Sequence, residues 1–375
     1  MEIETRIPST VIDHYYRTLF PLETVFRWLD PSITTGYRIP QYREYAFVTT
    51  GGYFVRFKNA VTSFELSRLL RRYEPQAVHV GAVYDKVFGK ENVYNYPTAR
   101  EFVMDLDISD YHNIRTCSCS SDSFCSKCWP FMEIAVQCLE CLFPLAFGWH
   151  PNQWQWFFSG MKGLHCWVRE PEVVLMQTKY RYYMIDFFNR PPMKSKPVRN
   201  PGREVYETIL LPKFYSFLLK DHDLYENEIA RMYCSEYFSR VLFDKKRGNE
   251  TSLEYFERFC ETLEQSFGKE DAEKYIETII VKMLYPRLDY NVSRDSKHLI
   301  RCPFSVHDKS GNLVLPLTRC DFQSVSQAIQ NTNIYNLMPD ALDHYVRILD
   351  SSIQASRMLP QAQPRNQPST QRLLV

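Results

Sequence analysis

The chain has 375 residues, 45% of them hydrophobic, so it is long enough to bury the core of one large domain or two smaller ones. Its formal net charge is only +1, which means that any nucleic-acid-binding surface must be a local one. The acidic N-terminus has no apolar run and no stretch approaches about 18 consecutive apolar residues, so we expect neither a signal peptide nor a membrane-spanning helix.

The elements predicted along the chain mix helices with short strands. Helices are predicted at residues 9–29 (divided by Pro21), near 62–73, near 130–142, at 171–188 and throughout 204–284. Strands are predicted at 44–49 and 53–58 (a hairpin), at 77–84 and 100–107, in a second hairpin after residue 150, and again between 287 and 317. The proline- and glutamine-containing tail from about residue 354 is expected to be disordered.

A basic, proline-rich run from Arg190 to Arg203 interrupts this pattern. Its charge is consistent with a contact to nucleic acid, but its composition is more typical of a solvated linker. The sequence leaves both interpretations open.

Residues 100–107 are the most informative stretch of the chain. Val103, Asp105 and Asp107 alternate with apolar residues, as on a strand, so the two carboxylates are expected to share one face. Adjacent like charges are unfavourable on a strand unless something offsets them. A pair of Mg²⁺ or Mn²⁺ ions would do so and would also clamp a phosphate. The alternative is an edge strand whose polar face meets water.

Four of the 11 cysteines form a cluster at Cys117, Cys119, Cys125 and Cys128. An odd cysteine number in a chain without a secretory signal indicates a reducing compartment, where thiols stay free or bind metal. Four thiolates at this spacing predict a structural Zn²⁺ site, closed to chemistry because all four positions are filled by protein.

A glycine-rich turn follows an aromatic strand at Trp154–Phe158. Ser159, Lys162 and His165 in and after this turn could all donate to phosphate oxygens, and the glycines allow close approach of a ligand. An ordinary hairpin turn with an exposed lysine is the alternative.

A last motif runs from Tyr285 to His307. Asp289 is predicted to lie at the start of a strand, and Arg301 and His307 follow it. A single aspartate is usually structural, so this motif indicates a function only in combination with the other motifs.

Together the motifs resemble the catalytic small subunit of eukaryotic DNA primase. The resemblance runs from about residue 14 to about residue 316, in the order Asp-x-Asp strand, four-cysteine knuckle, Ser-Gly-x-x-Gly-x-His-x-Trp turn, Arg-Leu-Asp and Pro-Phe-Ser-Val-His. It implies a mixed α+β (α/β) archaeo-eukaryotic primase fold with an inserted helical subdomain and a zinc knuckle. The implied domains are a catalytic part at 1–190 and 285–350 with the knuckle at 117–128, a helical subdomain at 191–284 and a tail at 354–375.

The resemblance also implies roles for individual residues. Three carboxylates match its catalytic Mg²⁺ or Mn²⁺ ligands: Asp105, Asp107 and Asp289. Nucleotide-binding positions are Glu44, Arg56, Ser159, Lys162, His165, Arg301 and His307, and the zinc ligands are Cys117, Cys119, Cys125 and Cys128.

Three departures from the family pattern stand out. The family often has two arginines where this chain has Met161 and Lys162, and lysine lacks the planar bidentate fork of arginine. Ser118 separates two cysteines that are adjacent in the family. Just before Gly-Ala-Val, where the family tends to carry an acid that helps to read the sugar, this chain has His79, which puts ribose selection in doubt.

The function implied is DNA-directed RNA primer synthesis by two-metal nucleotidyl transfer on single-stranded DNA during replication. The implied partners are the primase large subunit, DNA polymerase α, the template, the RNA primer and NTPs, without a membrane, and the implied location is the nucleus. Two alternatives remain: a related primase-polymerase that makes DNA primers or acts in repair or translesion synthesis, and a catalytically inactive nucleic-acid-binding subunit.

Overall fold

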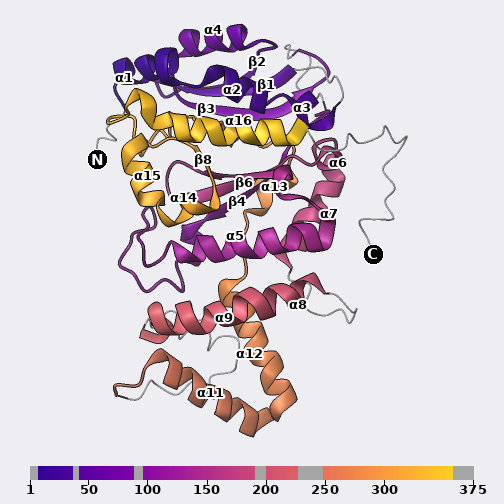
Figure 1. Cartoon of the computed structure of the whole chain (residues 1–375), viewed down its shortest axis with the longest axis vertical. Helices are drawn as coiled ribbons and strands as arrows, with labels where there is room; N and C mark the ends of the chain where they lie inside the picture. Colours follow the sequence, from indigo (N-terminus) through magenta and orange to yellow (C-terminus); the bar gives the residue numbers. More distant parts are fainter. Residues whose placement is uncertain (1–6, 37–41, 88–95, 191–199, 227–247, 358–375) are drawn as a thin grey trace. The chain divides into compact units, whose positions relative to one another are not determined.

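The computed structural model describes residues 7–36, 42–87, 96–190, 200–226 and 248–357 (Figure 1). The chain forms two compact units. The first comprises Met1–Asp105, Trp149–Ile185 and Asp289–Val375, and the second comprises Leu106–Gly148 and Asp186–Leu288. Both units are therefore assembled from segments far apart in the sequence. The predicted domain limits near residues 190 and 285 stay a prediction.

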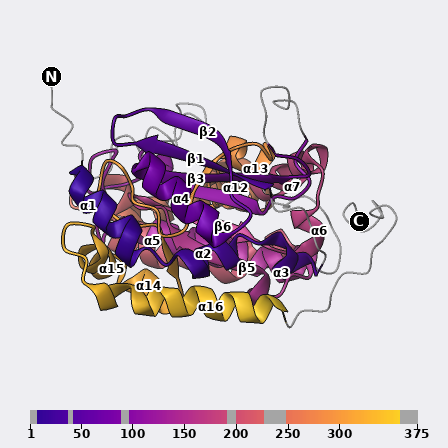
Figure 2. The ribbon, with the colours of Figure 1, turned by 90° about the horizontal axis from the view of Figure 1, so that it is seen from above.

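The first unit contains an antiparallel sheet in the order β2-β1-β3-β7. Its strands are β1 (Tyr42–Thr49), β2 (Phe54–Asn59), β3 (Pro75–Tyr84) and β7 (Ile300–Arg301). The predicted hairpin is confirmed, and β2 forms the outer edge of this sheet (Figure 2). Helix α4 (Ser63–Tyr73) connects β2 to β3, and Thr62 caps its first turn by accepting a hydrogen bond from the backbone N–H of Glu65.

A second sheet has the order β4-β6-β5-β8. Its strands are β4 (Phe102–Asp107), β5 (Trp154–Phe158), β6 (Gly163–Val168) and β8 (Leu315–Leu317). Every residue of β5, β6 and β8 is buried, which accounts for their continuous apolar runs. Strands do return after residue 287, as predicted, but only β7 and β8 form, and both are short.

The N-terminal and C-terminal segments of the chain both contribute helices to the first unit. The helix predicted at 9–29 consists of α1 (Ser9–His14), a π-helical segment (Tyr15–Leu19) and, after Pro21, α2 (Leu22–Trp28). A short helix that was not predicted, α3 (Pro31–Thr35), follows. Helix α16 (Asp343–Arg357) contacts α2, α3 and β8. It extends through residues 354–357, where the sequence predicted a disordered tail, and the rest of that tail lies outside the described residues.

The other helices of the first unit are short, except α7 (Thr178–Asn189), whose last residues belong to the second unit. They are α6 (Pro171–Val174), α13 (Tyr290–Arg294), α14 (Arg319–Gln323) and α15 (Val325–Thr332). The single helix predicted over 171–188 is thus divided between α6 and α7.

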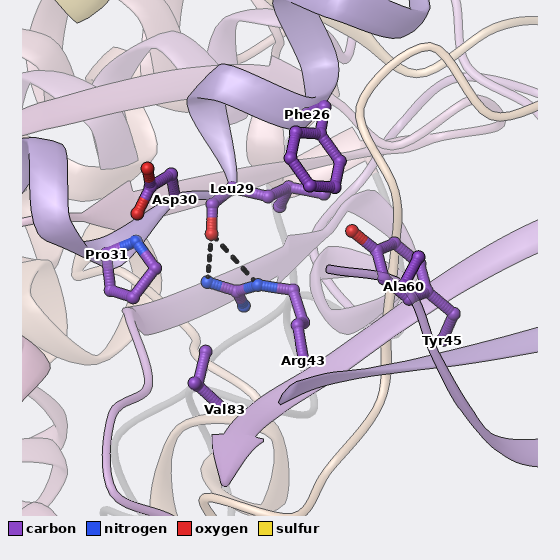
Figure 3. A pocket seen from close by; sticks show the side chains of 8 residues that line it. All are labelled: Phe26, Leu29, Asp30, Pro31, Arg43, Tyr45, Ala60 and Val83. Atoms are coloured by element: carbon purple, nitrogen blue, oxygen red, sulfur yellow. Dashed lines mark hydrogen bonds between the residues drawn. The ribbon is translucent and has the colours of Figure 1, made fainter. Parts of the chain in front are cut away.

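A buried ion pair links β1 to the residue directly before β4. Arg43 on β1 donates to both carboxylate oxygens of Glu101, at 2.7 and 3.1 Å. It also donates to the backbone oxygen of Leu29, at 2.6 and 3.0 Å (Figure 3). Although burial opposes ionisation, Arg43 lowers the pKa of Glu101 to about 2. The small cavity beside Arg43 is therefore a packing feature of this buried pair.

The second unit is helical. It contains α5 (Pro130–Leu142), α8 (Pro201–Val205), α9 (Leu211–Lys213), α11 (Ser252–Phe267) and α12 (Lys269–Leu284). Two π-helical segments, Tyr206–Leu210 and Phe214–Asp221, join α8 and α9 into one longer helical run. Aromatic rings form much of its core, with Phe131 of α5 packed edge-on against Phe217 at 5.0 Å between centroids.

Only one helical segment in the described part of the chain, Pro130–Phe147, has the length and composition to cross a membrane. Half of it is buried inside the protein, as is typical of the core helix of a globular protein.

Candidate active site and metal centre

Strand β4 presents two carboxylates on one face. Its residues 102–104 and Leu106 are buried, while Asp105 and Asp107 are the two partly exposed positions of the strand. Oδ1 of Asp107 accepts hydrogen bonds from the backbone N–H of Ser109 at 2.7 Å and from its hydroxyl at 2.6 Å. These bonds start a 3₁₀ turn at Ile108 and fix the Asp107 carboxylate at the end of the strand.

Asp289 lies beside Asp105, although in a different local structure from the one predicted. Its backbone N–H donates to the carbonyl of Asp105 at 3.1 Å. The prediction that Asp289 starts a strand was wrong: it is the N-cap of α13, and its Oδ1 accepts from the N–H of Asn291 at 2.8 Å. After one isolated bridge at Leu288 the chain turns into a helix, because the aspartate side chain satisfies an otherwise unpaired helical N–H.

The glycine-rich turn between β5 and β6 is held against the loop that carries His307. Ser159 and Gly163 close the turn with two hydrogen bonds of 2.9 and 3.1 Å. Gly160 has a φ of +96°, and a Cβ at this position would lie 2.8 Å from Cβ of His307. The hydroxyl of Ser310 donates to the carbonyl of Gly160 at 2.7 Å. The structure therefore brings two motifs together that are about 150 residues apart.

His165 on β6 connects the carboxylates to the basic residues. Its Nε2 lies 3.6 Å from Oδ1 of Asp105. Burial, with Arg301 and His307 nearby, lowers the pKa of His165 to about 3, so the ring is neutral at pH 7. The contact with Asp105 is thus not an ion pair, and Nδ1 has no hydrogen-bond partner among the described residues.

Arg301 and His307 lie together at the end of the first sheet. Arg301 pairs across the sheet with His79, and its Nη1 contacts Oδ1 of Asp308 at 3.1 Å. Burial and Arg301 lower the pKa of His307 to about 4, and Lys162 adds to this shift, which places its charge nearby. Although Asp308 is half-buried, Arg301 and His307 hold its pKa below the usual range.

Asp308 was missed by the sequence analysis. The only signal was its position directly after His307, which does not reveal that it is the ionic partner of Arg301. Arg301 is therefore already neutralised in part, a fact that the motif alone could not provide.

Glu44 and Arg56 form a second ion pair near this site. Nε of Arg56 lies 3.0 Å from Oε1 of the fully buried Glu44. A Cβ on Gly81 would lie 2.9 Å from Oε2 of Glu44, so the glycine leaves room for this carboxylate. The pair is on the face of the sheet that also carries His79, as the strand register shows.

His79 is the position where the family pattern has an acid. Burial and Arg301 lower its pKa to about 3, so the ring is neutral. Its Nδ1 is buried and has no hydrogen-bond partner among the described residues. A neutral imidazole can donate or accept a hydrogen bond, but it does not offer the charge of a carboxylate.

The four predicted cysteine ligands converge in the second unit. The sulfur atoms of Cys117, Cys119, Cys125 and Cys128 lie within 4.8 Å of one another, and none forms a disulfide. Tetrahedral Zn–S bonds of about 2.3 Å would place the sulfurs about 3.8 Å apart. The observed separation between Cys125 and Cys128 is 3.9 Å. The donor set and its spacing therefore fit a zinc ion.

Polar groups around the cysteines also suit a thiolate site. The backbone N–H of Cys125 donates to the sulfur of Cys128 at 3.3 Å, and the buried Arg115 lies 3.9 Å from the same sulfur. Arg115 further holds the loop through the carbonyls of Ser120 and Ser123. Such donors stabilise negative sulfur ligands around a metal.

Among the described residues, the cysteine cluster alone places three or more ligand atoms within 4.8 Å. The carboxylate oxygens of Asp105, Asp107 and Asp289 do not come that close together, and Oδ1 of Asp107 and of Asp289 each accept a capping hydrogen bond. Their backbones are nevertheless adjacent. The arrangement of carboxylates beside neutral imidazoles and an arginine is that of a candidate site for nucleotide chemistry.

Comparison with known proteins agrees with this class. The family model for the DNA primase small subunit matches residues 104–319. The DNA primase small subunit of Drosophila melanogaster is 27% identical over 336 residues, which cover 81% of this chain and 75% of the relative. The small subunit of Saccharomyces cerevisiae is 25% identical over 344 residues, which cover 84% of this chain and 83% of the relative. That of Schizosaccharomyces pombe is 27% identical over 343 residues, which cover 83% of this chain and 73% of the relative.

Because the family model covers more than half of the chain, the chain belongs to the DNA primase small subunit family. The resemblance read from the motifs is confirmed, and so are the mixed α+β fold and the assignment as an enzyme of DNA replication. The family is that of the catalytic, nucleotidyltransferase subunit of primase.

Proposed function

We propose that this chain synthesises short RNA primers on single-stranded DNA, with Asp105, Asp107 and Asp289 as the ligands of two catalytic divalent ions. The observation that carries the proposal is the hydrogen bond between the N–H of Asp289 and the carbonyl of Asp105. It places the third carboxylate-bearing segment next to the strand that carries the other two. Family membership supplies the reaction class.

The carboxylates would hold Mg²⁺ or Mn²⁺. When bound, such ions lower the pKa of an attacking 3′-hydroxyl and neutralise phosphate oxygens. Asp105 and Asp107, on one face of β4, can be shared between two ions, whereas Asp289 approaches from α13 and would bind one of them. Their hard oxygen donors suit these cations better than zinc.

The triphosphate would be held by the basic residues around His165. His165 contacts Asp105, and the charges of Arg301 and His307 are close enough to lower its pKa. Lys162 adds a donor to the same group, and the Ser159 hydroxyl, which accepts a hydrogen bond from the N–H of Gly163, can still donate its own hydrogen. Such preorganised donors stabilise the charge that develops on the leaving pyrophosphate.

Glu44 and Arg56 are proposed as nucleotide-site residues that act through their ion pair. Glu44 is buried and bidentate to Arg56, so its main effect is to fix the guanidinium at the sheet surface. A fixed guanidinium can contact a phosphate or a sugar without a large loss of side-chain entropy.

His79 favours a second candidate function. A neutral imidazole in place of an acid changes the hydrogen-bonding group that would meet the sugar of the bound nucleotide. A related primase-polymerase that accepts deoxynucleotides, and so makes DNA primers or acts in repair, remains the alternative on this ground.

The cysteine cluster is proposed to hold one structural Zn²⁺. A closed tetrahedral site has no open position, so its contribution is to the stability of the 117–128 loop. We further propose the primase large subunit and DNA polymerase α as partners and the nucleus as the location, because the relatives are eukaryotic primase small subunits. The catalytic part would span residues 1–190 and 285–350, and the helical subdomain residues 191–284.

The test is primer synthesis by the purified chain on poly(dT), with labelled ATP or dATP. Mg²⁺- or Mn²⁺-dependent oligomers from ATP, absent in the Asp105→Asn variant, are the expected result. Products from dATP at an equal rate would favour the primase-polymerase. Absence of any product with either nucleotide and either metal ion would contradict both.

A further inference from the structure

The edge strand β2 exposes several aromatic side chains. Tyr53, Phe54 and Phe57 are 75%, 54% and 41% exposed, within five consecutive residues. Phe54 and Phe57 belong to β2, an edge strand of the first sheet (Figure 2), and Tyr53 lies in the hairpin loop directly before it. A cluster of exposed aromatic side chains is typical of a surface that binds a ligand or another macromolecule. We call these three residues the β2 aromatic edge.

A β-bulge interrupts the strand at this point. Two steps along β1, from Tyr45 to Phe47, oppose three steps along β2, from Lys58 to Val55. Phe57 takes up the extra length with a φ of +60°, which a phenylalanine rarely adopts. Bulges at sheet edges re-aim side chains, and this one lies next to Arg56, which reaches Glu44.

The β2 aromatic edge is continuous with the candidate active site. The ring of Phe54 packs edge-on against His79, with 5.9 Å between centroids. His79 in turn pairs with Arg301 across the sheet. The guanidinium of Arg56 lies 4.9 Å from the ring centroid of Phe57. A polymer lying along β2 would therefore lead directly to His79 and Arg301.

The charge on β2 is positive, although the whole chain is nearly neutral. The strand carries Arg56 and Lys58 and no acidic residue. The other basic residues nearby in the sequence, Arg68, Arg71 and Arg72, belong to α4, which packs on the opposite face of the sheet through the stacked rings of Tyr73 and Phe47. Aromatic side chains interleaved with basic ones are typical of surfaces for single-stranded nucleic acid, on which bases stack while lysine and arginine contact phosphates.

We propose that the β2 aromatic edge is the surface on which bases of the single-stranded DNA template stack as the strand enters the active site. This inference rests on the proposed primase function. A protein strand added to the β2 edge is less favourable, because Arg56 and Lys58 lie within the strand, and charges at an edge oppose strand addition. A nucleobase instead needs only the exposed ring faces.

The test is the affinity of the full chain for fluorescein-labelled oligo(dT), measured by fluorescence anisotropy over a range of salt concentrations. Phe54→Ala should weaken binding by between about fivefold and a hundredfold, as loss of base stacking does. The dependence on salt should not change, because no charge is removed. Phe54→Trp should restore the affinity, since tryptophan offers a larger ring.

Two controls separate stacking from other effects. Phe267→Ala removes a similarly exposed phenylalanine, 47% accessible, from α11 and should leave DNA binding unchanged. ATP binding in the absence of DNA should be unaffected by Phe54→Ala. If Phe54→Ala does not fold, Tyr53→Ala, at the most exposed position, takes its place.

Three results would overturn the proposal. The first is wild-type affinity for oligo(dT) in Phe54→Ala. The second is an equal loss of ATP binding, which would assign the ring to the nucleotide. The third is normal DNA binding by Phe54→Ala together with weaker binding to a purified primase large subunit, which would make β2 a protein interface. Failure of the primase function is a separate outcome: the wild-type chain would then bind oligo(dT) but make no primer.

Discussion

Replacing Gly160 by alanine tests the contact between the glycine turn and the His307 loop. The backbone of Gly160 has a φ of +96°, and the new Cβ would lie 2.8 Å from Cβ of His307. A left-handed conformation costs an L-residue about 1–2 kcal/mol. Inserting a methyl group into a closely packed contact costs a further 1–3 kcal/mol, roughly. Relative to the wild type, the native conformation of the turn should therefore be destabilised by about 2–5 kcal/mol in the variant.

The consequence should be visible in nucleotide binding. If the turn moves away from His307, the steric part of about 1–3 kcal/mol becomes a loss in ATP affinity of about five- to 150-fold. Gly148→Ala is the matched control, because Gly148 also has a positive φ (+69°) but no atom lies within 4 Å of its new Cβ. It should lower stability by about 1–2 kcal/mol and leave ATP binding unchanged.

The assays are ATP titration and urea denaturation of both variants. Equal losses in Gly160→Ala and Gly148→Ala would refute the reasoning, because they would show that the approach to His307 has no cost. Unchanged ATP binding in Gly160→Ala, despite lost stability, would show that the turn is not part of the nucleotide site.

Three further predictions follow from the candidate sites. Asp105→Asn, Asp107→Asn and Asp289→Asn should each abolish primer synthesis with an unchanged melting temperature, because asparagine has the same size and retains the capping hydrogen bonds of Asp107 and Asp289; more than a tenth of the wild-type rate would remove that residue from the metal site. Purified protein should contain one zinc per chain by metal analysis, and Cys125→Ser should lower its stability rather than its catalytic rate, whereas zinc-free, fully stable wild type would contradict the assignment. Burial lowers the pKa of His79 in the folded state from 6.5 to about 3, so unfolding takes up a proton below pH 6.5 and the stability should fall as the pH drops from 6.5 towards 3. The urea midpoint of His79→Gln should fall less over the same pH range, and an equal fall would contradict the pKa shift.

Local patterns predicted much of the first unit. The carboxylate strand follows from period-two alternation, and the hairpin of β1 and β2 from two strand-like runs separated by a glycine turn. Helix α4 lies within the range predicted for it, 62–73. The bulge at Phe57 could not be predicted, because strand register depends on tertiary contacts such as the one between Arg56 and Glu44.

Capping explains two further differences. The sequence placed Asp289 in a strand, but its side chain bonds to the N–H of Asn291, and an aspartate cap competes effectively with strand pairing. One helix was predicted over 171–188, yet α6 ends at Val174 and α7 begins at Thr178. The apolar periodicity continues across that break, so it does not reveal the break.

The candidate site was predictable as a set of residues rather than as a geometry. Carboxylates, cysteines and the glycine turn are visible in the sequence, since each has a distinctive spacing. The partnership of Arg301 with Asp308 and the neutral state of His165 arise from burial and from neighbours distant in the chain. Such features require the folded arrangement.

The central claim is that Asp105, Asp107 and Asp289 bind the catalytic ions. The most direct measurement is anomalous diffraction at the manganese edge from crystals grown with MnCl₂ and a non-hydrolysable ATP analogue. The account predicts two manganese peaks next to Asp105 and Asp107, one of them also bound by Asp289, with the triphosphate on the side of Arg301. Manganese bound elsewhere, with no peak beside these carboxylates, would contradict it.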